Sequence, residues 1–422
     1  MRKGGKVMMK KLLVILMVFV FLVPAFAQTV QSKKKVNAKP AIKKTAIKKI
    51  PAKKPVAVKA VPKAVVQAPE PEDKLGDLRE DMNKALADLK GQVEKIKSDN
   101  SDAKVGGAIF FRWQNHTQNG GTSVNNFDVD RAYLDFKKKL AGGANARITL
   151  DVARQVAPNT QQLFDYLKYA YVEIPVGIPS SLQIVPFELN AKIGLQHTVW
   201  IDWADKILNL RYIAKTIIDN EGVMSSADFG LGAFGKITLP YLPDIEYQAT
   251  VLNGTGYKAT ETDGKKAVGV RVNTTAFDGG DAGKVITGVF VNVAGVDSSL
   301  SMNGSDKLAG GLIAYKHDLG TADIEYFRGT NKNGYSIGGV YSLGSLINFL
   351  PGLGVFARLD SYDPSMTKAN DQLDRSFYGA TYDINKDIKL AMDMQNVTGG
   401  SAASTSAGKT TSIFYLHSMV QL

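Results

Sequence analysis

Apolar and polar side chains alternate without a break in the stretch Asn145-Ala146-Arg147-Ile148-Thr149-Leu150-Asp151-Val152. A period of two places the two sets on opposite faces of a β-strand. The same alternation recurs at 245–251 and 387–395. Strands with one apolar face and one charged face are expected where one side of a sheet meets lipid and the other meets water.

This pattern recurs often enough after residue 100 to define sixteen candidate strands. They start near Gly106, Phe127, Asn145, Tyr166, Leu182, Phe229, Asp244, Lys266, Val285, Leu308, Thr321, Gly334, Leu353, Arg375, Asp387 and Thr411. An even count brings both ends of the barrel to the same side of the membrane, as barrels of this type require. The sequence therefore predicts an all-β fold, a transmembrane antiparallel β-barrel of about 16 strands over 101–422. Because a few gaps have unusual lengths, about 14 or 18 strands remain alternatives.

The gaps between these strands alternate in length. Outer gaps such as 115–126 and 397–410 are long and rich in Asn, Gly, Ser and Thr, whereas inner gaps such as 318–320 and 385–386 are short. Outer-membrane barrels combine long outer loops with short inner turns in this way. A water-soluble β-sandwich would also alternate in polarity, but the number of strands favours the barrel.

The last strand supports the same interpretation. It sets four apolar residues on one face up to the final position: Phe414, Leu416, Val420 and Leu422. This resembles the C-terminal strand that outer-membrane barrels present to their assembly machinery, although Leu422 stands where a Phe is usual.

The first 27 residues predict export. Basic residues precede the apolar run Leu12–Val23, and the small-residue pattern Ala25-Phe26-Ala27 follows. This order is typical of a secretory signal peptide over 1–27, with cleavage before Gln28. A membrane-spanning anchor helix is the alternative, but it needs about 20 apolar residues and the run is shorter.

The net charge of +12 is concentrated at the front of the chain. Residues 28–63 hold 12 lysines and no Asp or Glu, whereas from Ala64 onward 35 Lys and Arg face 40 Asp and Glu. The main domain is therefore mildly acidic, and we expect no nucleic-acid partner. With 6 prolines and no aromatic residue, 28–71 predicts a disordered periplasmic tether. Its lysines favour peptidoglycan or another anionic wall polymer as a partner, with a plain soluble spacer as the alternative.

Residues 72–100 predict a short coiled-coil helix. The segment lacks proline from 72 on, and apolar residues recur at heptad spacing: Met82, Leu86, Leu89, Val93 and Ile96. Such a short coil is marginal alone and is favoured when a larger oligomer brings the helices together. A single amphipathic helix lying on its own chain is the alternative.

Enzyme chemistry has little support in this sequence. There is no cysteine, which excludes disulfides and thiol catalysis. The four histidines, His116, His197, His317 and His417, form no HExxH pair, and no GxSxG motif occurs. His417 beside Ser418 is the one pair of the kind that outer-membrane lipases use. We expect no enzyme, metal or cofactor.

The longest outer gap, 197–228, is the expected site of a constriction. Residues 200–215 predict a helix with Trp203, Ile207 and Leu210 on one face, and that face needs a surface to pack against. The barrel interior provides one, so we expect seven charged residues in or near the channel: Asp202, Asp205, Lys206, Arg211, Lys215, Asp219 and Glu221. Charged rings at a constriction set ion preference. Packing over the rim, or against a neighbouring subunit, is the alternative.

Five arginines on the strands are expected to line the channel: Arg112, Arg131, Arg147, Arg154 and Arg271. An Arg that faces lipid at the membrane centre costs about 2–4 kcal/mol, which favours the inward direction. Asp130, Asp135 and Asp151 lie beside them. The mixed signs leave anion and cation preference open.

Four stretches of the early strands share a pattern with a known family: Phe127-Asp-Val-Asp-Arg-Ala-Tyr-Leu-Asp-Phe-Lys137, Ala146–Asp151, Leu167–Glu173 and Ile193–Thr198. They resemble the early strands of the phosphate-selective porins O and P, a family of outer-membrane porins. The resemblance covers about 105 to 220 and implies a sixteen-stranded trimeric porin. Family members often continue the long loop with Thr-Pro, where this chain has Thr198-Val199, and no cluster matches their phosphate-binding arginines. Phosphate selectivity is therefore not implied.

Together these features predict an outer-membrane porin of a Gram-negative cell, in contact with outer-membrane lipids and with its N-terminal tail in the periplasm. Its expected activity is passive diffusion of small ions and hydrophilic solutes, with anions as candidate permeants. The alternative is a structural protein that tethers the outer membrane to the cell wall through its basic tail.

Overall fold

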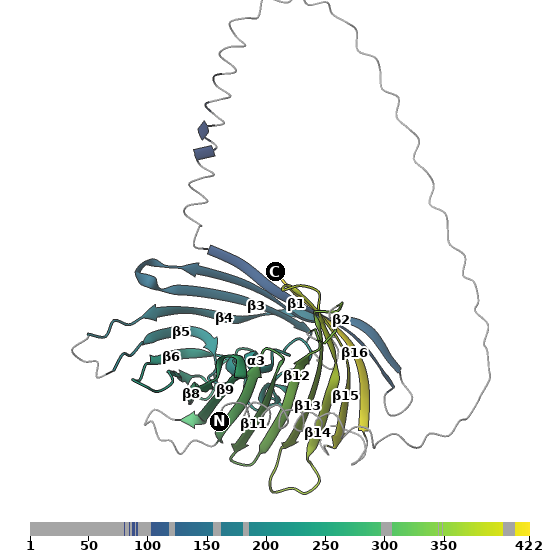
Figure 1. The fold of residues 1–422 in the computed structure, drawn as a ribbon. Coiled ribbons are helices and arrows are strands. Elements are labelled where there is room, and N and C mark those ends of the chain that lie inside the picture. The colour runs from purple at the N-terminus through teal and green to yellow at the C-terminus, as the bar shows by residue number, and fades with distance from the viewer. Residues whose placement is uncertain are drawn as a thin grey trace, which may run out of the picture. The chain divides into compact units, whose positions relative to one another are not determined.

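The computed structural model describes residues 103–117, 123–154, 162–179, 185–296, 306–344, 346–347, 349–399 and 410–422, and the positions 80, 84, 87, 88, 90 and 91. In this part of the chain, sixteen antiparallel strands form a closed barrel in which β1 pairs with β16 (Figure 1). The predicted fold and strand number are therefore confirmed.

The strands follow one another around the barrel in chain order. They are β1 (Ala103–Thr117), β2 (Ser123–Lys139), β3 (Asn145–Arg154), β4 (Leu163–Pro175), β5 (Asn190–His197), β6 (Ala227–Ile237), β7 (Ile245–Leu252), β8 (Lys266–Asp278), β9 (Lys284–Val296), β10 (Asp306–His317), β11 (Gly320–Gly329), β12 (Asn333–Ser342), β13 (Leu353–Asp363), β14 (Leu373–Asp383), β15 (Ile388–Gly399) and β16 (Thr410–Gln421). Two short 3-10 turns, η2 (Ala141–Gly143) and η4 (Gly280–Ala282), join β2 to β3 and β8 to β9.

One predicted strand start is wrong. The fifth strand begins at Asn190 and not near Leu182. Residues just before it approach β6 through an isolated bridge between Phe187 and Ile237. Pro186 has no backbone N–H to donate to a neighbouring strand, which limits regular pairing at this point.

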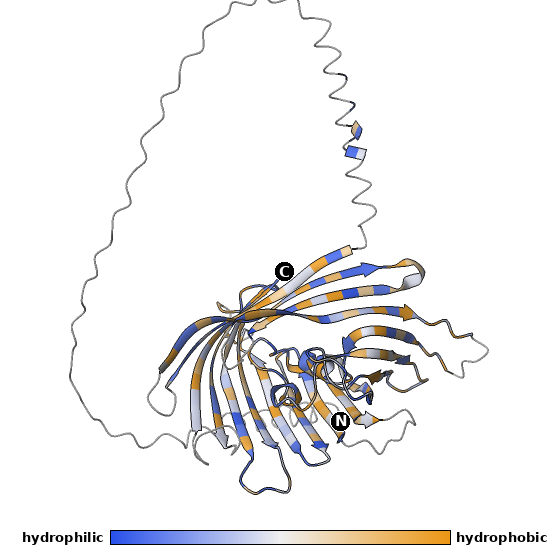
Figure 2. Ribbon diagram, turned by 180° about the vertical axis from the view of Figure 1, so that it is seen from behind, coloured by the Kyte–Doolittle hydropathy of each residue, from blue (hydrophilic) through white to orange (hydrophobic). Residues whose placement is uncertain are grey.

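The alternation seen in the sequence separates the two faces of the barrel wall. In β3, Ile148 is 49% exposed on the outer face, whereas its neighbour Thr149 and the carboxylate of Asp151 are fully buried on the inner face. Figure 2 shows the resulting alternation of apolar and hydrophilic positions along the strands. The outer face is thus the apolar one, as a lipid environment requires.

Two β-bulges change the direction of side chains in the early strands. The register between β1 and β2 shifts at Phe110 and Phe111, which leaves Asp130 as an extra residue in β2. The register between β3 and β4 shifts at Thr149 and Leu150, which leaves Lys168 as an extra residue in β4. A bulge re-aims the side chain of the extra residue. Lys168 consequently lies buried in the wall beside buried Tyr169.

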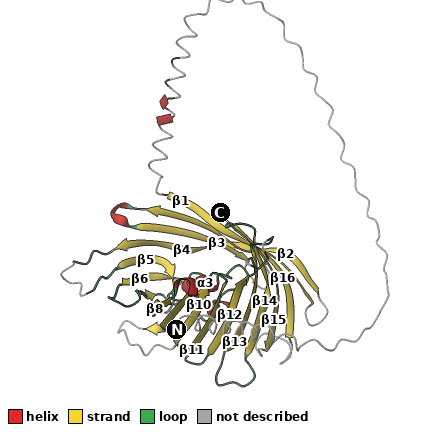
Figure 3. Cartoon of the chain, in the orientation of Figure 1, coloured by secondary structure: helices red, strands yellow, loops and turns green. Residues whose placement is uncertain are grey.

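The connection between β5 and β6, here called the inner loop (residues 198–226), folds into the barrel. It contains two helices, α3 (Ile201–Leu208) and α4 (Ile217–Asn220). Figure 3 shows α3 enclosed by the strands. The sequence led us to expect that this loop packs against the inner face of the barrel wall, and the loop lies there in the structure.

Two apolar clusters attach the inner loop to different parts of the wall. In the first, Val199, Trp200, Ile201, Ile217 and Ile218 pack with wall residues Phe290, Leu308, Leu312 and Phe327 from β9, β10 and β11. In the second, Leu210, Tyr212 and Ile213 pack with Phe110, Phe356 and Phe377 from β1, β13 and β14. Full burial of large side chains in both clusters fixes the loop across the interior.

The predicted helix over 200–215 is too long. The helix α3 ends at Leu208, because Asn209 adopts a left-handed conformation with φ of 57°. Asn tolerates this conformation better than most residues and often ends helices. Leu210 therefore belongs to the second cluster and does not share a face with Trp203 and Ile207, which pack against the first.

The segments before the barrel are only partly described. Residues 80, 84, 87, 88, 90 and 91 are helical, within the segment predicted as a helix. The coiled-coil residues Met82, Leu86, Leu89, Val93 and Ile96, the signal peptide and the tether lie outside the described residues. Among the residues that are described, no helix combines the length and apolar character needed to cross a membrane.

Candidate functional site

Three polar contacts fasten the inner loop to the wall in addition to its apolar clusters. The indole N–H of Trp200 donates to Glu325 Oε1 on β11 at 2.6 Å. Arg271 on β8 donates to the carbonyl of Val199 at 2.9 Å. Arg375 on β14 donates through Nε to Glu221 Oε1 at 2.7 Å. The loop is thus tied to three separate strands, and charge-assisted bonds of this kind are stronger than neutral ones.

A cavity of about 250 Å³, here called the charged cavity, lies between the inner loop and the first strands of the barrel. The wall contributes Tyr133, Asp135, Arg147, Lys168 and Tyr169, from β2, β3 and β4. The loop contributes Asp202, Asp205, Lys206 and Arg211. Charged side chains from two opposite surfaces therefore meet at the narrowed part of the interior.

Most of these charges are paired with one another. Arg147 contacts Asp135 at 2.9 Å, and Lys206 contacts Asp202 at 2.6 Å. Arg211 contacts Asp205 at 2.7 Å and Asp219 at 2.6 Å. The pairs hold the side chains in place and leave little net charge of their own.

Lys168 is the exception. It forms no ion pair with any carboxylate in the described ranges, although its side chain is almost fully buried. Its ammonium lies 3.1 Å from the hydroxyl of Tyr133 and 4.6 Å from the centre of that ring. A cation over an aromatic face is stabilised but keeps its charge. The charged cavity therefore has four basic and three acidic side chains, with the surplus at Lys168.

Asp205 and Asp219 both pair with Arg211, but the two carboxylates differ in their pKa. Burial raises the pKa of Asp205 even though Arg211 lies beside it, and the neighbouring Asp219 adds to the rise. Burial also acts on Asp219, but Arg211 and Lys215 together hold the pKa of Asp219 below its ordinary value. Asp205 therefore takes up a proton before Asp219 does as the pH falls.

The seven loop residues predicted for the constriction divide into two groups. Four of them line the charged cavity, as given above. The other three lie behind it: Asp219 pairs with Arg211, Lys215 approaches Asp219 at 3.6 Å, and Glu221 binds Arg375 of the wall. These three support the loop and do not line the cavity.

The five predicted strand arginines also divide. Arg147 lines the charged cavity, Arg271 binds the inner loop, and Arg131 pairs with buried Asp151 at 3.3 Å. Arg112 and Arg154 line another cavity instead, of about 600 Å³, here called the outer groove. It is also lined by exposed apolar side chains of β1, β2, β4, β15 and β16.

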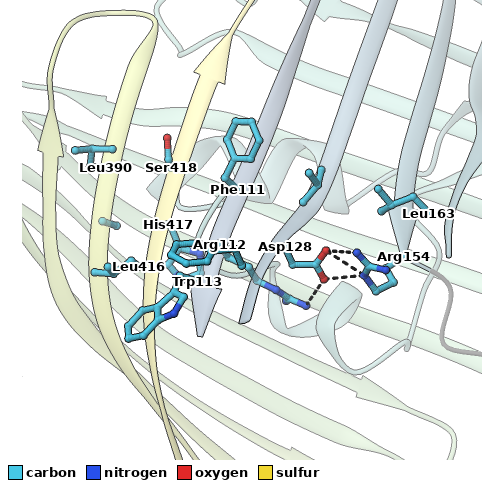
Figure 4. A pocket seen from close by; sticks show the side chains of 13 residues that line it. Phe111, Arg112, Trp113, Asp128, Arg154, Leu163, Leu390, Leu416, His417 and Ser418 are labelled. Carbon is cyan, nitrogen blue, oxygen red and sulfur yellow. Dashed lines mark hydrogen bonds and ion pairs between the residues drawn. The ribbon is translucent and has the colours of Figure 1, made fainter. Parts of the chain in front are cut away.

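Figure 4 shows this outer groove from close by. Asp128 accepts hydrogen bonds from Arg154 and lies near Arg112, while Phe111, Leu416 and Leu163 form the apolar surface around them. None of these residues lines the charged cavity. The structure thus separates Arg112 and Arg154 from the place where the loop narrows the interior.

His417 does not form a site with Ser418. It lies 2.8 Å from Asp393 through its Nε2 atom, and both side chains are buried. Successive residues of a strand point to opposite faces, so Ser418 is turned away from this pair.

Several residues of the site were missed by the sequence analysis: Tyr133, Lys168, Tyr169, Glu325 and Arg375. Lys168 lies within β4, and the bulge that turns it inward has no signature in the local sequence. Glu325 and Arg375 are far from the loop in sequence, so their contacts with Trp200 and Glu221 appear only once the barrel is closed.

No family model matches the chain, and no curated protein matches it. Solved structures do. The high-pH structure of Pseudomonas putida OprB matches with 9% identity and a TM-score of 0.54, over 79% of this chain and 97% of that one. The low-pH structure of OprB matches with 7% identity and a TM-score of 0.50, over 79% and 96%. The outer membrane protein opdK from Pseudomonas aeruginosa matches with 11% identity and a TM-score of 0.46, over 76% and 99%. At such low identity, the likeness to OprB shows a common fold.

Proposed function

We propose that this chain is a porin of the Gram-negative outer membrane, with its N-terminal tail in the periplasm. It forms a water-filled channel through which small ions and hydrophilic solutes diffuse passively. A sixteen-stranded barrel is wide enough to enclose an aqueous channel, unlike the narrow eight-stranded kind. The exposed apolar side chains of the outer face fit contact with outer-membrane lipids.

The position of the inner loop carries this proposal. In a narrow barrel, wall side chains alone fill the interior. In this barrel a loop that is bonded to three strands occupies part of the interior. Here the loop narrows the interior and leaves the charged cavity beside the wall of β2, β3 and β4. A narrowing lined by charge is the arrangement that selects among ions in channels.

Lys168 gives this channel a weak preference for anions. The other three basic residues of the charged cavity are each paired with an aspartate, so their fields largely cancel at a distance. The ammonium of Lys168 has only tyrosine partners in the described part of the chain. Its charge therefore acts on a passing ion.

Planar bilayer recordings of the refolded mature protein under a potassium chloride gradient test both statements. We expect open-channel steps and a reversal potential of the sign that favours chloride. Lys168→Gln should move the reversal potential toward cation preference, while the channel stays open. A membrane that remains silent at high protein concentration would contradict the porin proposal itself.

A matched variant controls for the charge change. Lys284 pairs with Asp278 at 2.6 Å beside the η4 turn, away from the charged cavity. Lys284→Gln should therefore leave the reversal potential unchanged. If both variants shift it equally, the preference comes from overall charge and not from Lys168.

We also propose a homotrimer, supported by the resemblance to the trimeric porins O and P and by the heptad pattern over 82–96. Conductance steps in multiples of three would support the trimer. Single steps, from protein that runs as a monomer after chemical cross-linking, would contradict it. Membership of the phosphate-selective porins O and P stays a prediction from the early strands.

A tethering role is a second proposal, supported by the 12 lysines and absent acids of 28–63. It can coexist with the channel. Deletion of 28–71 should reduce binding of the protein to purified peptidoglycan without changing conductance. Equal binding of peptidoglycan by the parent protein and by the deletion variant would show that residues 28–71 act only as a spacer.

A further inference from the structure

A second, much smaller cavity lies between the inner loop and strands β11, β12 and β13, and it shares Asp205 and Arg211 with the charged cavity. Its volume is about 20 Å³. This is room for a single particle of the size of water. Here called the small cavity, it is lined by polar and charged groups of both the loop and the wall, including Arg211, Thr216, Asp323, Glu325, Ser336 and Arg358.

Two oxygen atoms in this lining have no hydrogen-bond partner within the described ranges. They are Thr216 Oγ1 and Asp323 Oδ1. Thr216 is 9% exposed and Asp323 is 8% exposed, so bulk water does not satisfy them. Buried polar atoms are almost always paired, and two unpaired ones beside the same cavity indicate a missing binding partner.

The charges around the small cavity do not balance. Arg211 is engaged by Asp205 and Asp219, and Arg358 holds Asp360 through two hydrogen bonds of 2.9 and 2.7 Å. No lysine or arginine among the residues described pairs with Asp323 or Glu325. The contact of Glu325 is with the neutral indole of Trp200. Two buried carboxylates without a counter-ion are costly.

The candidate partners differ in what they supply. A water molecule would satisfy the two oxygen atoms but would not compensate the charge, and a proton would compensate charge but would not fill the cavity. A small cation does both. Magnesium keeps several waters and calcium needs six to eight oxygens, which this volume does not admit. In the described part of the chain, no three acidic or histidine side chains converge as a multivalent metal site.

The wall packs closely around the small cavity at Gly338. A Cβ atom at Gly338 of β12 would lie 2.7 Å from Leu208 Cδ1 of the loop and 3.3 Å from Asp323 Oδ1. Any larger residue would press on the end of α3 and on the unpaired oxygen.

We propose that the small cavity binds one monovalent cation of the size of Na⁺, held by oxygen atoms of Asp323, Glu325 and Thr216. The bound ion joins β11 to the inner loop and so fixes the position of the constriction. The site does not depend on which solute the channel carries.

The tryptophans of the loop provide a direct measurement. The chain has three, of which Trp200 and Trp203 lie in the loop and Trp113 in β1. In refolded full-length protein with Trp113→Phe, fluorescence reports release of the loop on titration with urea. We expect the midpoint to rise with Na⁺ concentration when N-methyl-D-glucamine replaces Na⁺ at constant chloride and ionic strength, as linkage requires.

Two variants test the assignment of the site. Asp323→Asn and Thr216→Val should each remove the dependence on Na⁺, whatever they do to the midpoint itself. Asp306→Asn is the matched control, because Asp306 pairs with Lys332 at the start of β10 and should leave the dependence intact. Should either site variant fail to fold, the other and the salt series of the parent protein decide the question.

Three outcomes would overturn the proposal. One is a midpoint that does not respond to Na⁺. Another is a response that is equal in the parent and both site variants. The third is a midpoint that follows pH but not Na⁺, which would assign a proton to the two carboxylates in place of the cation.

Discussion

The two cavities beside α3 carry opposite charge surpluses. The charged cavity, toward β2, β3 and β4, has one cation more than its carboxylates balance, at Lys168. The small cavity, toward β11, β12 and β13, has two carboxylates, Asp323 and Glu325, that form no ion pair within the described ranges, where Arg358 pairs with Asp360. The cavity with room for solutes keeps a charge available to them. The small cavity must compensate its charge locally, because burial there makes uncompensated charge costly.

Release of the loop should have the largest effect, because it would merge the two cavities. Trp200 is fully buried in the first apolar cluster and donates to Glu325. Trp200→Ala removes both contributions, and truncation of a buried Trp costs about 3–5 kcal/mol. We expect the loop to leave the wall and single-channel conductance to rise several-fold. Bilayer recordings measure this.

Trp200→Phe separates the two contributions. It keeps most of the apolar volume and loses only the N–H donated to Glu325. Its conductance should stay close to that of the parent protein. An unchanged conductance for Trp200→Ala would show that the loop does not limit the passage of ions. The charges of the two cavities would then have no effect on transport.

Loss of the third wall contact should have a smaller effect. Arg375→Met leaves Glu221 buried without its cation, and a buried charge-assisted hydrogen bond contributes about 1.5–3 kcal/mol. We expect the loop to be released at lower urea concentration by Trp fluorescence while the channel conducts normally in buffer. The double variant Arg375→Met with Glu221→Gln should recover part of the loss. If the double variant is no better than the single one, the pair does not hold the loop.

The pattern of side chains predicts the barrel well and the site only in part. The alternation of polar and apolar side chains at Arg147 and Ile148 depends only on neighbouring residues. It can therefore be predicted from the sequence, and Ile148 is exposed on the outer face as expected. The direction of Lys168 depends on an extra residue opposite β3, and the end of α3 depends on the left-handed conformation of Asn209. The contact between Trp200 and Glu325 depends on closure of the whole barrel. Local periodicity cannot report such long-range consequences.

Lower pH should shift the balance of the charged cavity through Asp205. Its pKa is raised by burial and by neighbouring Asp219, against the effect of Arg211. The folded loop therefore binds this proton more tightly than the unfolded loop does. Stability of the loop should rise as the pH falls through the folded-state pKa, and the gain is complete below the ordinary carboxyl pKa of about 4.

Protonation of Asp205 also removes one negative charge from the charged cavity. We expect the reversal potential to move toward anion preference as the pH falls from 7 toward that range. Asp205→Asn should show the shifted value already at pH 7 and little further change. A parent protein and an Asp205→Asn variant with the same pH profile would assign the titration to another group.

The smallest effect is expected for Lys206→Gln. This substitution removes the same formal charge as Lys168→Gln does, but from a more exposed position. The Lys206 side chain is 72% exposed and pairs with Asp202 one turn earlier in α3. Exposed pairs of this kind contribute about 0.3–0.5 kcal/mol, so Lys206→Gln should leave the urea midpoint almost unchanged. Water screens its charge, so the reversal potential should move less than for Lys168→Gln. Equal shifts in the two variants would mean that net charge alone sets the preference, and that the bulge which buries Lys168 has no part in it.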